Sequence, residues 1–354
     1  MFGWRRPARQ PATPPAVAAG GAVAANEPRA ESARAAGRPE PERLLRRLEW
    51  TVLRRLDGLL QGDYRTLFRG FGLDLADLHE YQLHDDVRYI DWNVTARLQI
   101  PHVREFQEDR EVAAWFLLDL SASIDFGSRG VRKRVLSAEL VAVLARLFTR
   151  YGNRVGAVLH AGNANEVIPA RNGRRHVLHL LDRIGVIGER AAPGRAGARA
   201  GKVTDLAELL AVARSVIKRR SVVFVVSDFI SAPGWGRRMA QLARRHDVVA
   251  VRLTDPMETE LPDLGLVVMQ DAETGEQLTV DTHDRAFRRR FAAAAERREL
   301  ELRAALAEAG VDCLELATDE PLDAALLRFT RLRKRRSQLA AGGVPALVAE
   351  RRAR

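Results

Sequence analysis

Hydrophobic residues recur along most of this chain in two alternating spacings. Between residues 41 and 60, leucine and valine fall three and four positions apart, which is the spacing of one face of an α-helix. From residue 112 onward, short unbroken apolar runs alternate with longer segments of helical spacing. A short apolar run bounded by polar residues is typical of a strand buried on both faces of a parallel sheet.

The expected strands and helices follow one another as βαβ units. Buried strands are predicted at 112–118, 154–160, 221–227, 248–253 and 311–316. Helices are predicted at 131–151, 176–184, 205–218, 236–245, 286–309 and from residue 321. Two further short strands, 266–269 and 277–280, have the pattern of a β-hairpin. This alternation predicts an α/β fold with a doubly wound, mostly parallel sheet and a β-hairpin insertion.

Composition divides the chain into four parts. We expect a disordered Ala/Pro/Arg-rich arm at 1–40, an N-terminal helix and small mixed β block at 41–112, an α/β domain at 113–327 with its hairpin at 264–283, and a basic helix end and tail at 328–354. The formal net charge of +11 lies in the first and last parts, so residues 41–327 are neutral. The basicity therefore does not indicate a nucleic-acid-binding fold.

The cell compartment is constrained by cysteine content and hydropathy. The single cysteine, Cys313, excludes an intramolecular disulfide and a cysteine metal cluster, and it fits a reducing compartment. No stretch reaches the roughly 18 apolar residues of a membrane span. The N-terminal arm is too weakly hydrophobic for a secretion signal. We therefore expect a cytoplasmic protein.

Oxygen-bearing side chains follow two of the predicted strands. The strand at 112–118 runs into Asp119, and the strand at 221–227 runs into Asp228. Ligands of doubly wound folds gather at the carboxyl ends of strands, where two such carboxylates would repel each other unless a cation lay between them. Ser121 and Ser123 follow Asp119 at alternate positions, and Thr204 opens a predicted helix. These oxygens predict a site for Mg²⁺, or for Mn²⁺ or Ca²⁺. The alternative is that the same residues serve only as helix caps and turn residues.

The pattern Asp-x-Ser-x-Ser, then Thr, then Asp resembles the metal-ion-dependent adhesion site (MIDAS) of von Willebrand factor A domains. The resemblance assigns the five places to Asp119, Ser121, Ser123, Thr204 and Asp228, with the serine hydroxyls on the metal and Asp228 acting through water. It implies a binding module whose metal accepts an acidic side chain of a partner. The sequence departs from the pattern before Thr204, where Lys202 and Val203 are bulky, and Asp205 is an adjacent competing ligand.

The segment before the first buried strand carries a second resemblance. Residues 81–92 read Tyr-Gln-Leu-His-Asp-Asp-Val-Arg-Tyr-Ile-Asp-Trp, and Ala96-Arg97 follows. This is similar to the Tyr-x-x-Gly-Asp-Asp-x-Arg-x-Ile-Asp-Trp signature of the MoxR-associated domain of unknown function 58 (DUF58), which precedes an A-type domain. Further matches are Leu253-x-Asp255-Pro256, Leu261-Pro262 and the segment 271–276, so that the resemblance covers 50–337. The sequence departs from the family at His84, where Gly is usual, and at Ile124, where Met is common.

Two interpretations of this signature block stay open. Its charged and aromatic residues are Asp85, Asp86, Arg88, Asp91, Trp92 and Arg97. The five charged residues form an ion-pair network that holds the block on the A-type domain, or the block is a surface that binds a partner. We favour the network because charged clusters are more often structural.

The function that these features predict is protein interaction without catalysis. The DUF58 resemblance implies a MoxR-type AAA+ ATPase as working partner, in a chaperone-like or complex-maturation task, together with a client protein that supplies the acidic ligand. One alternative is a Mg²⁺-dependent phosphoryl-transfer enzyme, although such enzymes require a second Asp at the position of Ser121. The other is a nucleic-acid binder that acts through the basic tails.

Overall fold

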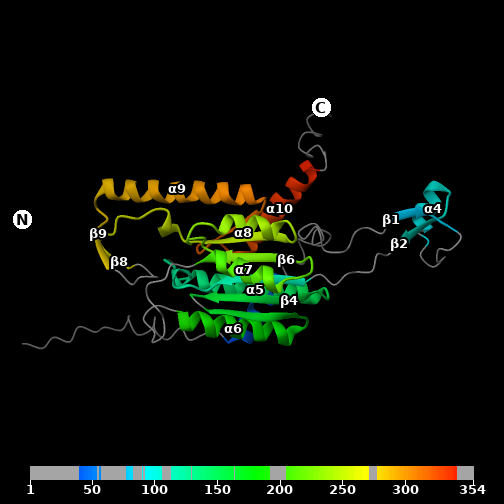
Figure 1. The fold of residues 1–354 in the computed structure, drawn as a ribbon, viewed down its shortest axis with the longest axis horizontal. Helices are drawn as coiled ribbons and strands as arrows, with labels where there is room; N and C mark the ends of the chain where they lie inside the picture. Colours follow the sequence, from blue (N-terminus) through cyan, green and yellow to red (C-terminus); the bar gives the residue numbers. More distant parts are fainter. Residues whose placement is uncertain are drawn as a thin grey trace, which may run out of the picture. The chain divides into compact units, whose positions relative to one another are not determined.

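The computed structural model of the chain is shown in Figure 1. It describes residues 40–53, 56, 77–82, 90, 92–105, 113–128, 130–162, 164–191, 205–270 and 277–340. The predicted arm up to residue 39, residues 57–60 of the segment with helical spacing and the tail beyond residue 340 lie outside the described residues. None of the helices in the described parts is both long and apolar enough to cross a membrane.

A six-stranded sheet forms the centre of the fold. Its order is β10-β7-β6-β3-β4-β5. The strands are β3 (Ala113–Asp119), β4 (Arg154–Ala161), β5 (Ala164–Arg171), β6 (Val222–Ser227), β7 (Asp247–Thr254) and β10 (Asp312–Ala317). All neighbours pair in parallel except β4 and β5, which are antiparallel. The predicted α/β fold with a doubly wound, mostly parallel sheet is therefore confirmed.

Helices cover both faces of this sheet, and each face has its own hydrophobic core. One face carries α5 (Lys133–Arg150), α6 (Arg174–Ala191), α10 (Leu322–Ala340) and α1 (Pro41–Leu48). The other carries α7 (Leu206–Val216), α8 (Trp235–Ala243) and α9 (Arg285–Ala309). Figure 1 shows α6 and α9 on opposite sides of the strands.

The unbroken apolar runs follow from this two-sided burial. In β3, Phe116 and Leu118 lie in the α5–α6 core, whereas Trp115 and Leu117 lie in the α7–α9 core. Because successive side chains of a strand point to opposite faces, both faces must be apolar when helices cover both. Phe116 also stacks on Phe224 of β6, with ring centroids 5.2 Å apart.

The edge strand β5 was not predicted from the sequence, and α6 is longer than the predicted helix at 176–184. The sequence of β5, Ala-Asn-Glu-Val-Ile-Pro-Ala-Arg, has neither a continuous apolar run nor a regular alternation. Its pairing with β4 shifts register between Val155 and Ala157, opposite the segment that contains Pro169. Proline has no N–H for the ladder, so an edge strand with a bulge is a position where it is tolerated.

The N-terminal helix belongs to the α5–α6 core. Leu44, Leu45 and Leu48 of α1 are buried in that core, and a π-helical turn, Glu49–Leu53, continues the helix. Glu49 accepts hydrogen bonds from Arg146 of α5, at 2.8 Å, and from Arg174 of α6, at 3.1 Å. The spacing of leucines from residue 41 thus corresponds to a helix packed on the domain.

Two small β elements lie outside the central sheet. The predicted hairpin is present as β8 (Leu266–Gln270) and β9 (Gln277–Asp281), which pair antiparallel. In the predicted mixed β block, β1 (Asp77–Glu80) pairs antiparallel with β2 (His102–Glu105). Helix α4 (Trp92–Leu98) lies between them in the chain.

Candidate metal site

The two carboxylates predicted to share a site lie on neighbouring strands at the point where the strand order reverses. β3 and β6 are adjacent, and the chain continues from β3 to β4 on one side and from β6 to β7 on the other. Asp119 is the last residue of β3, and Asp228 directly follows β6. The crevice at such a switch point is where open α/β sheets bind their ligands.

Asp119 is fully buried, and both its oxygens accept hydrogen bonds. The backbone N–H of Ser121 donates to Oδ1 over 2.9 Å, and the hydroxyl of Ser227 donates to Oδ2 over 2.7 Å. Burial, together with the negative charge of Asp228, raises the pKa of Asp119 to about 6. The charge of Asp228 thus acts on the buried carboxylate of Asp119, in line with the repulsion that the sequence pattern predicts.

The predicted serines meet beside Asp119. A 3-10 turn, Ala122–Asp125, directly follows Ser121 and brings the hydroxyls of Ser121 and Ser123 within 3.1 Å of each other. The side chain of Ser121 is buried and that of Ser123 half-buried. Hydroxyl oxygens that point together next to a buried carboxylate are suitable ligands for a hard divalent cation.

A buried lysine, which sequence analysis did not place in the site, contacts the second carboxylate. Lys133, in the first turn of α5, is 0% exposed. Its ammonium donates to Oδ2 of Asp228 over 2.9 Å and to Oε1 of Glu258 over 2.6 Å. Burial disfavours the charged lysine, but the two carboxylates outweigh burial and raise the pKa of Lys133. Lys133 is therefore a fixed positive charge inside the site.

Glu258 is itself positioned by a capping box. Asp255 accepts a hydrogen bond from the N–H of Met257 over 3.0 Å, and Glu258 accepts one from the N–H of Asp255 over 3.1 Å. Asp255 also accepts from Ser128 and Thr318, at 2.8 and 2.6 Å. Burial disfavours its ionisation, but these hydrogen bonds outweigh burial and lower the pKa of Asp255. The matched segment Leu253-x-Asp255-Pro256 therefore helps to hold the lysine's second partner.

The cluster carries a net negative charge. Asp119, Asp228 and Glu258, if all ionised, contribute three negative charges against the single positive charge of Lys133. The remaining charge of −2 would be balanced by the +2 charge of one divalent cation. The donor set therefore fits Mg²⁺ by chemistry and by charge: two carboxylates and two hydroxyls, with no sulfur or imidazole in the predicted set. Within the described parts of the chain, no three His, Cys, Asp or Glu side chains converge as a metal site, so the hydroxyls are essential to this assignment.

His160 is a further neighbour that sequence analysis missed. It is the register partner of Asp119 across β3 and β4, and it is fully buried. Asp119 follows Leu117 by two residues, and His160 follows Val158 by two. Leu117 and Val158 lie in the α7–α9 core, and residues two apart in a strand point to the same face, so Asp119 and His160 face that side. Nδ1 of His160 lies 2.8 Å from Oδ1 of Asn165, whereas Nε2 has no hydrogen-bond partner among the described residues. A buried polar atom without a partner is uncommon and is consistent with a nearby ligand.

The remaining predicted residues are placed only in part. Thr204 lies outside the described residues, so its role as a ligand stays a prediction. Its neighbour Asp205, the expected competitor, caps α7 by accepting the N–H groups of Ala207 and Glu208 at 2.9 and 3.3 Å. That carboxylate is therefore already engaged in holding the helix start.

The signature block remains untested as a site. Asp85, Asp86, Arg88 and Asp91 lie outside the described residues. Trp92 and Arg97 lie on α4, where Trp92 is 70% exposed and Arg97 is also exposed. Both the ion-pair network and the partner surface proposed for this block stay predictions.

The sequence carried signals for the two missed charged residues of the site. Lys133 precedes Leu136 and Ser137 by three and four positions, which places it on the buried face of α5. Asp255 and Glu258 stand three residues apart with proline between them, in the pattern of a capping box.

Comparison with known proteins adds family relationships to this geometry. A sequence model described as "Protein of unknown function DUF58" matches residues 77–301. An uncharacterized protein of Mycobacterium tuberculosis is 38% identical over 299 residues, which cover 84% of this chain and 91% of that protein. A solved structure of BatB from Bacteroides thetaiotaomicron is similar at 14% identity, with a TM-score of 0.37, over 63% of this chain and 98% of that one. An aerotolerance-related membrane protein from Bacteroides fragilis gives 11% identity and a TM-score of 0.39 over 63% and 99%.

Proposed function

The chain belongs to the family of proteins of unknown function DUF58, and we propose that it is a non-enzymatic protein-interaction module that binds an acidic side chain of a partner through a divalent cation. The observation that carries the proposal is the cluster of Asp119, Ser121, Ser123 and Asp228 at the switch point of the sheet. A divalent cation bound there would supply an open coordination position for a carboxylate. Thr204 is the proposed fifth ligand.

The residues of the site hold positions rather than move protons. Both oxygens of Asp119 accept hydrogen bonds from the protein, so its carboxylate is oriented and partly neutralised. Lys133 occupies one oxygen of Asp228, and the N–H of Ile230 donates to the other over 3.0 Å. The feature that favours binding over phosphoryl transfer is Ser121, which stands two residues after Asp119, where the phosphoryl-transfer alternative requires a second Asp.

The proposed working partner is a MoxR-type AAA+ ATPase in the cytoplasm, as the DUF58 resemblance implies, with an acidic client protein as the ligand of the metal. The task would be chaperone-like or the maturation of a complex.

The basic end of the chain offers less support for nucleic-acid binding. Arg333 of α10 contacts both Asp247 and Asp312, and Arg336 also pairs with Asp312. These two arginines of the basic helix end therefore hold α10 on the edge of the sheet. Their charge is partly neutralised within the fold, which leaves less of it for phosphate contacts.

The test has two parts, metal binding and partner binding. Mn²⁺ titration followed by electron paramagnetic resonance should show one tight site in the full chain, lost in Asp119→Ala and Ser121→Ala. Ser215→Ala, an exposed hydroxyl of α7, is the matched control and should leave binding unchanged. Capture of the ATPase should then require the metal and fail in EDTA. Equal capture by Asp119→Ala and by the unaltered chain, with and without EDTA, would refute the metal bridge.

A further inference from the structure

A groove runs between α7 and α8 on the outer surface of the domain. Two cavities of about 630 and 600 Å³ lie along it, and they share Arg214 and Gln241. One is lined by Ala207, Pro233 and Gly234, near the starts of both helices, and the other by Ser215 and residues near the helix ends. Both helices begin at the carboxyl edge of the sheet, so the groove starts on the same edge as the candidate metal site.

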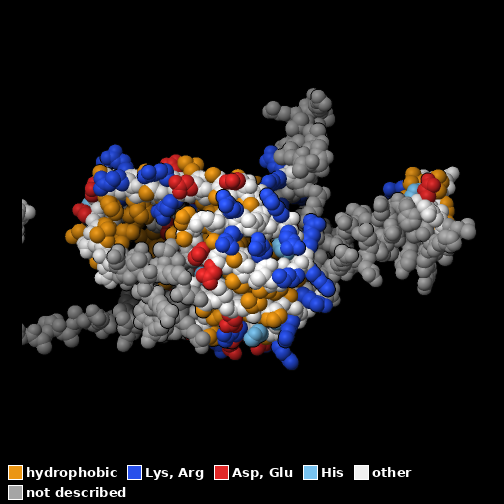
Figure 2. All heavy atoms as spheres, in the orientation of Figure 1, with side chains coloured by type: hydrophobic (Ala, Val, Ile, Leu, Met, Phe, Trp, Pro, Cys, Tyr) orange, Lys and Arg blue, Asp and Glu red, His pale blue; other side chains and the backbone are white. Residues whose placement is uncertain are grey.

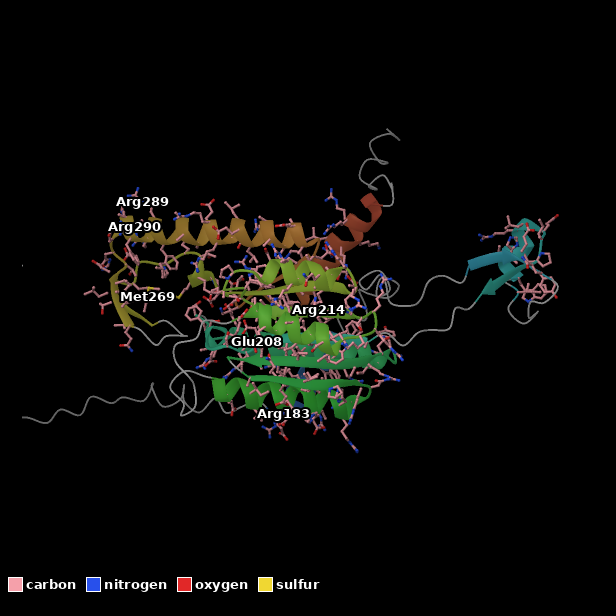
Figure 3. The ribbon with its side chains drawn as sticks, in the orientation of Figure 1. Arg183, Glu208, Arg214, Met269, Arg289 and Arg290 are labelled. Carbon is pink, nitrogen blue, oxygen red and sulfur yellow. The ribbon has the colours of Figure 1, made fainter. Side chains whose placement is uncertain are left out.

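The groove is lined by cations without matching carboxylates. Its charged lining residues are Arg214, Lys218, Arg237, Arg238, Arg244 and Arg245. All six are exposed, and none forms an ion pair with a carboxylate of the described residues. Figure 2 shows Lys and Arg side chains gathered over this region, and Figure 3 labels Arg214 on α7. In the same pocket linings there is no Asp or Glu.

At the start of α8, the positive charge of the groove is unfavourable when no partner is bound. Arg237 and Arg238 stand in the first turn, where the helix dipole already gives a partial positive charge. The N-cap is Gly234, at φ 107°, which has no side chain to accept from the first N–H groups. Ser, Thr, Asp and Asn are favoured at this position because their side chains can accept from those N–H groups. An anion at this end of the groove would meet two guanidinium groups and uncapped N–H groups together.

The shape and composition of the groove select among anionic partners. Its lining contains no aromatic side chain on which the bases of a single strand could stack. A duplex presents its phosphates on a convex backbone, whereas these cations line a groove between two adjacent helices. Five of the six cations are arginines, whose planar guanidinium groups can donate two parallel hydrogen bonds to one carboxylate.

We propose that the α7–α8 groove binds an extended acidic segment, rich in Asp and Glu, of a partner protein. Arg237 and Arg244 are separated by about 10 Å along α8, at about 1.5 Å per residue. That distance corresponds to about three residues of extended peptide, at about 3.3 Å each. The surface is separate from the metal site and does not require a cation, so the inference stands independently of the proposed function.

The test uses the full chain in EDTA, which keeps divalent cations out of the metal site. The protein is titrated into a fluorescein-labelled peptide of eight Asp and Glu residues, and binding is followed by fluorescence anisotropy. A Gly/Ser peptide of equal length and an oligodeoxythymidine of twelve nucleotides are measured in the same way. The variant Arg214→Gln/Arg237→Gln/Arg244→Gln should bind the acidic peptide at least about tenfold more weakly, because three charge-assisted contacts are lost. The matched control, Arg289→Gln/Arg290→Gln/Arg297→Gln, removes the same charge from α9, where Arg289 and Arg290 lie apart from Arg214 (Figure 3).

The control separates local binding from general attraction. It should lose no more than about twofold in affinity, because distant surface charges are screened at 0.15 M salt. A variant with lysine at the same three positions keeps the charge and should lose an intermediate amount of affinity, since only the planar guanidinium groups are removed. Equal losses in the groove variant and the α9 control would overturn the proposal. So would tighter binding of oligodeoxythymidine than of the acidic peptide at the same salt.

Discussion

Replacing Lys133 with methionine takes the ammonium away from Asp228 and Glu258 while keeping a side chain of similar length. The side chain of Asp228 is 1% exposed, so its carboxylate cannot recover hydration, whereas that of Glu258 is 24% exposed and can recover part of it. Removing one partner of a buried ion pair costs about 3–5 kcal/mol of unfolding free energy, because a buried charge is left uncompensated. At about 3 °C per kcal/mol for a domain of this size, the midpoint of thermal unfolding should fall by about 9–15 °C.

The assay is urea unfolding at pH 7 in EDTA, followed by circular dichroism. The control is Lys218→Met, an exposed lysine beyond the end of α7, which should change the unfolding free energy by no more than about 0.5 kcal/mol. Adding Asp228→Asn to Lys133→Met removes the more deeply buried of the two carboxylates that lose their lysine, and the double variant should recover more than half of the lost stability. A Lys133→Met variant as stable as the control would refute the buried ion pair.

The same variant tests whether Lys133 sets the charge of the metal site. Without its ammonium, the cluster of Asp119, Asp228 and Glu258 carries three uncompensated negative charges if all are ionised. Mg²⁺ should therefore raise the unfolding free energy of Lys133→Met more than that of the unaltered chain, since a tighter ligand of the folded state stabilises it more at equal concentration. Equal stabilisation of both proteins would contradict this role.

Three further predictions concern other residues. The pKa of Asp119, raised from 3.8 to about 6, favours the protonated carboxyl in the folded state. In EDTA it therefore contributes about 3 kcal/mol to the unfolding free energy below pH 3.8, and this contribution is lost as the pH rises through 6. Asp119→Asn should flatten the dependence of the unfolding free energy on pH, and an unchanged slope would count against the assignment. Burial raises the pKa of the Cys313 thiol to about 12, so iodoacetamide at pH 8 should modify it only on unfolding, and fast labelling of the folded chain would contradict its environment. Gly156→Ala would place a Cβ 2.8 Å from the ring of Trp115 and should cost about 1–3 kcal/mol in urea unfolding; a neutral effect would mean that the ring can move away.

The central layers of the fold were predictable because burial on both faces leaves a plain pattern. The continuous apolar runs of β3, β6 and β7 and the helical spacing in α5 follow from that burial. The position of Asp119 and Asp228 at strand ends was visible for the same reason. What linear spacing cannot show is that β3 and β6 become neighbours, because that depends on the order of strands across the sheet.

The parts that sequence analysis missed depend on contacts between distant segments. β5 is held by one neighbour at the sheet edge and needs no regular apolar alternation. Lys133 and Glu258 are 125 positions apart and form a pair only after folding. His160 is next to Asp119 through strand register, which follows from the pairing of β3 with β4. Local spacing indicates that Lys133 is buried and that Glu258 belongs to a capping box, but only the topology brings these residues and His160 to the site.

Pro169 at the sheet edge has a consequence for self-association. A strand at the edge of a sheet offers unpaired N–H and C=O groups to another chain, and a flat edge is a template for aggregation. In β5, proline withholds one donor, and the irregular register beside it interrupts the straight run of the strand. The edge formed by β5 is therefore a poor template for adding a strand from a second copy, which should help to keep the protein from aggregating at high concentration.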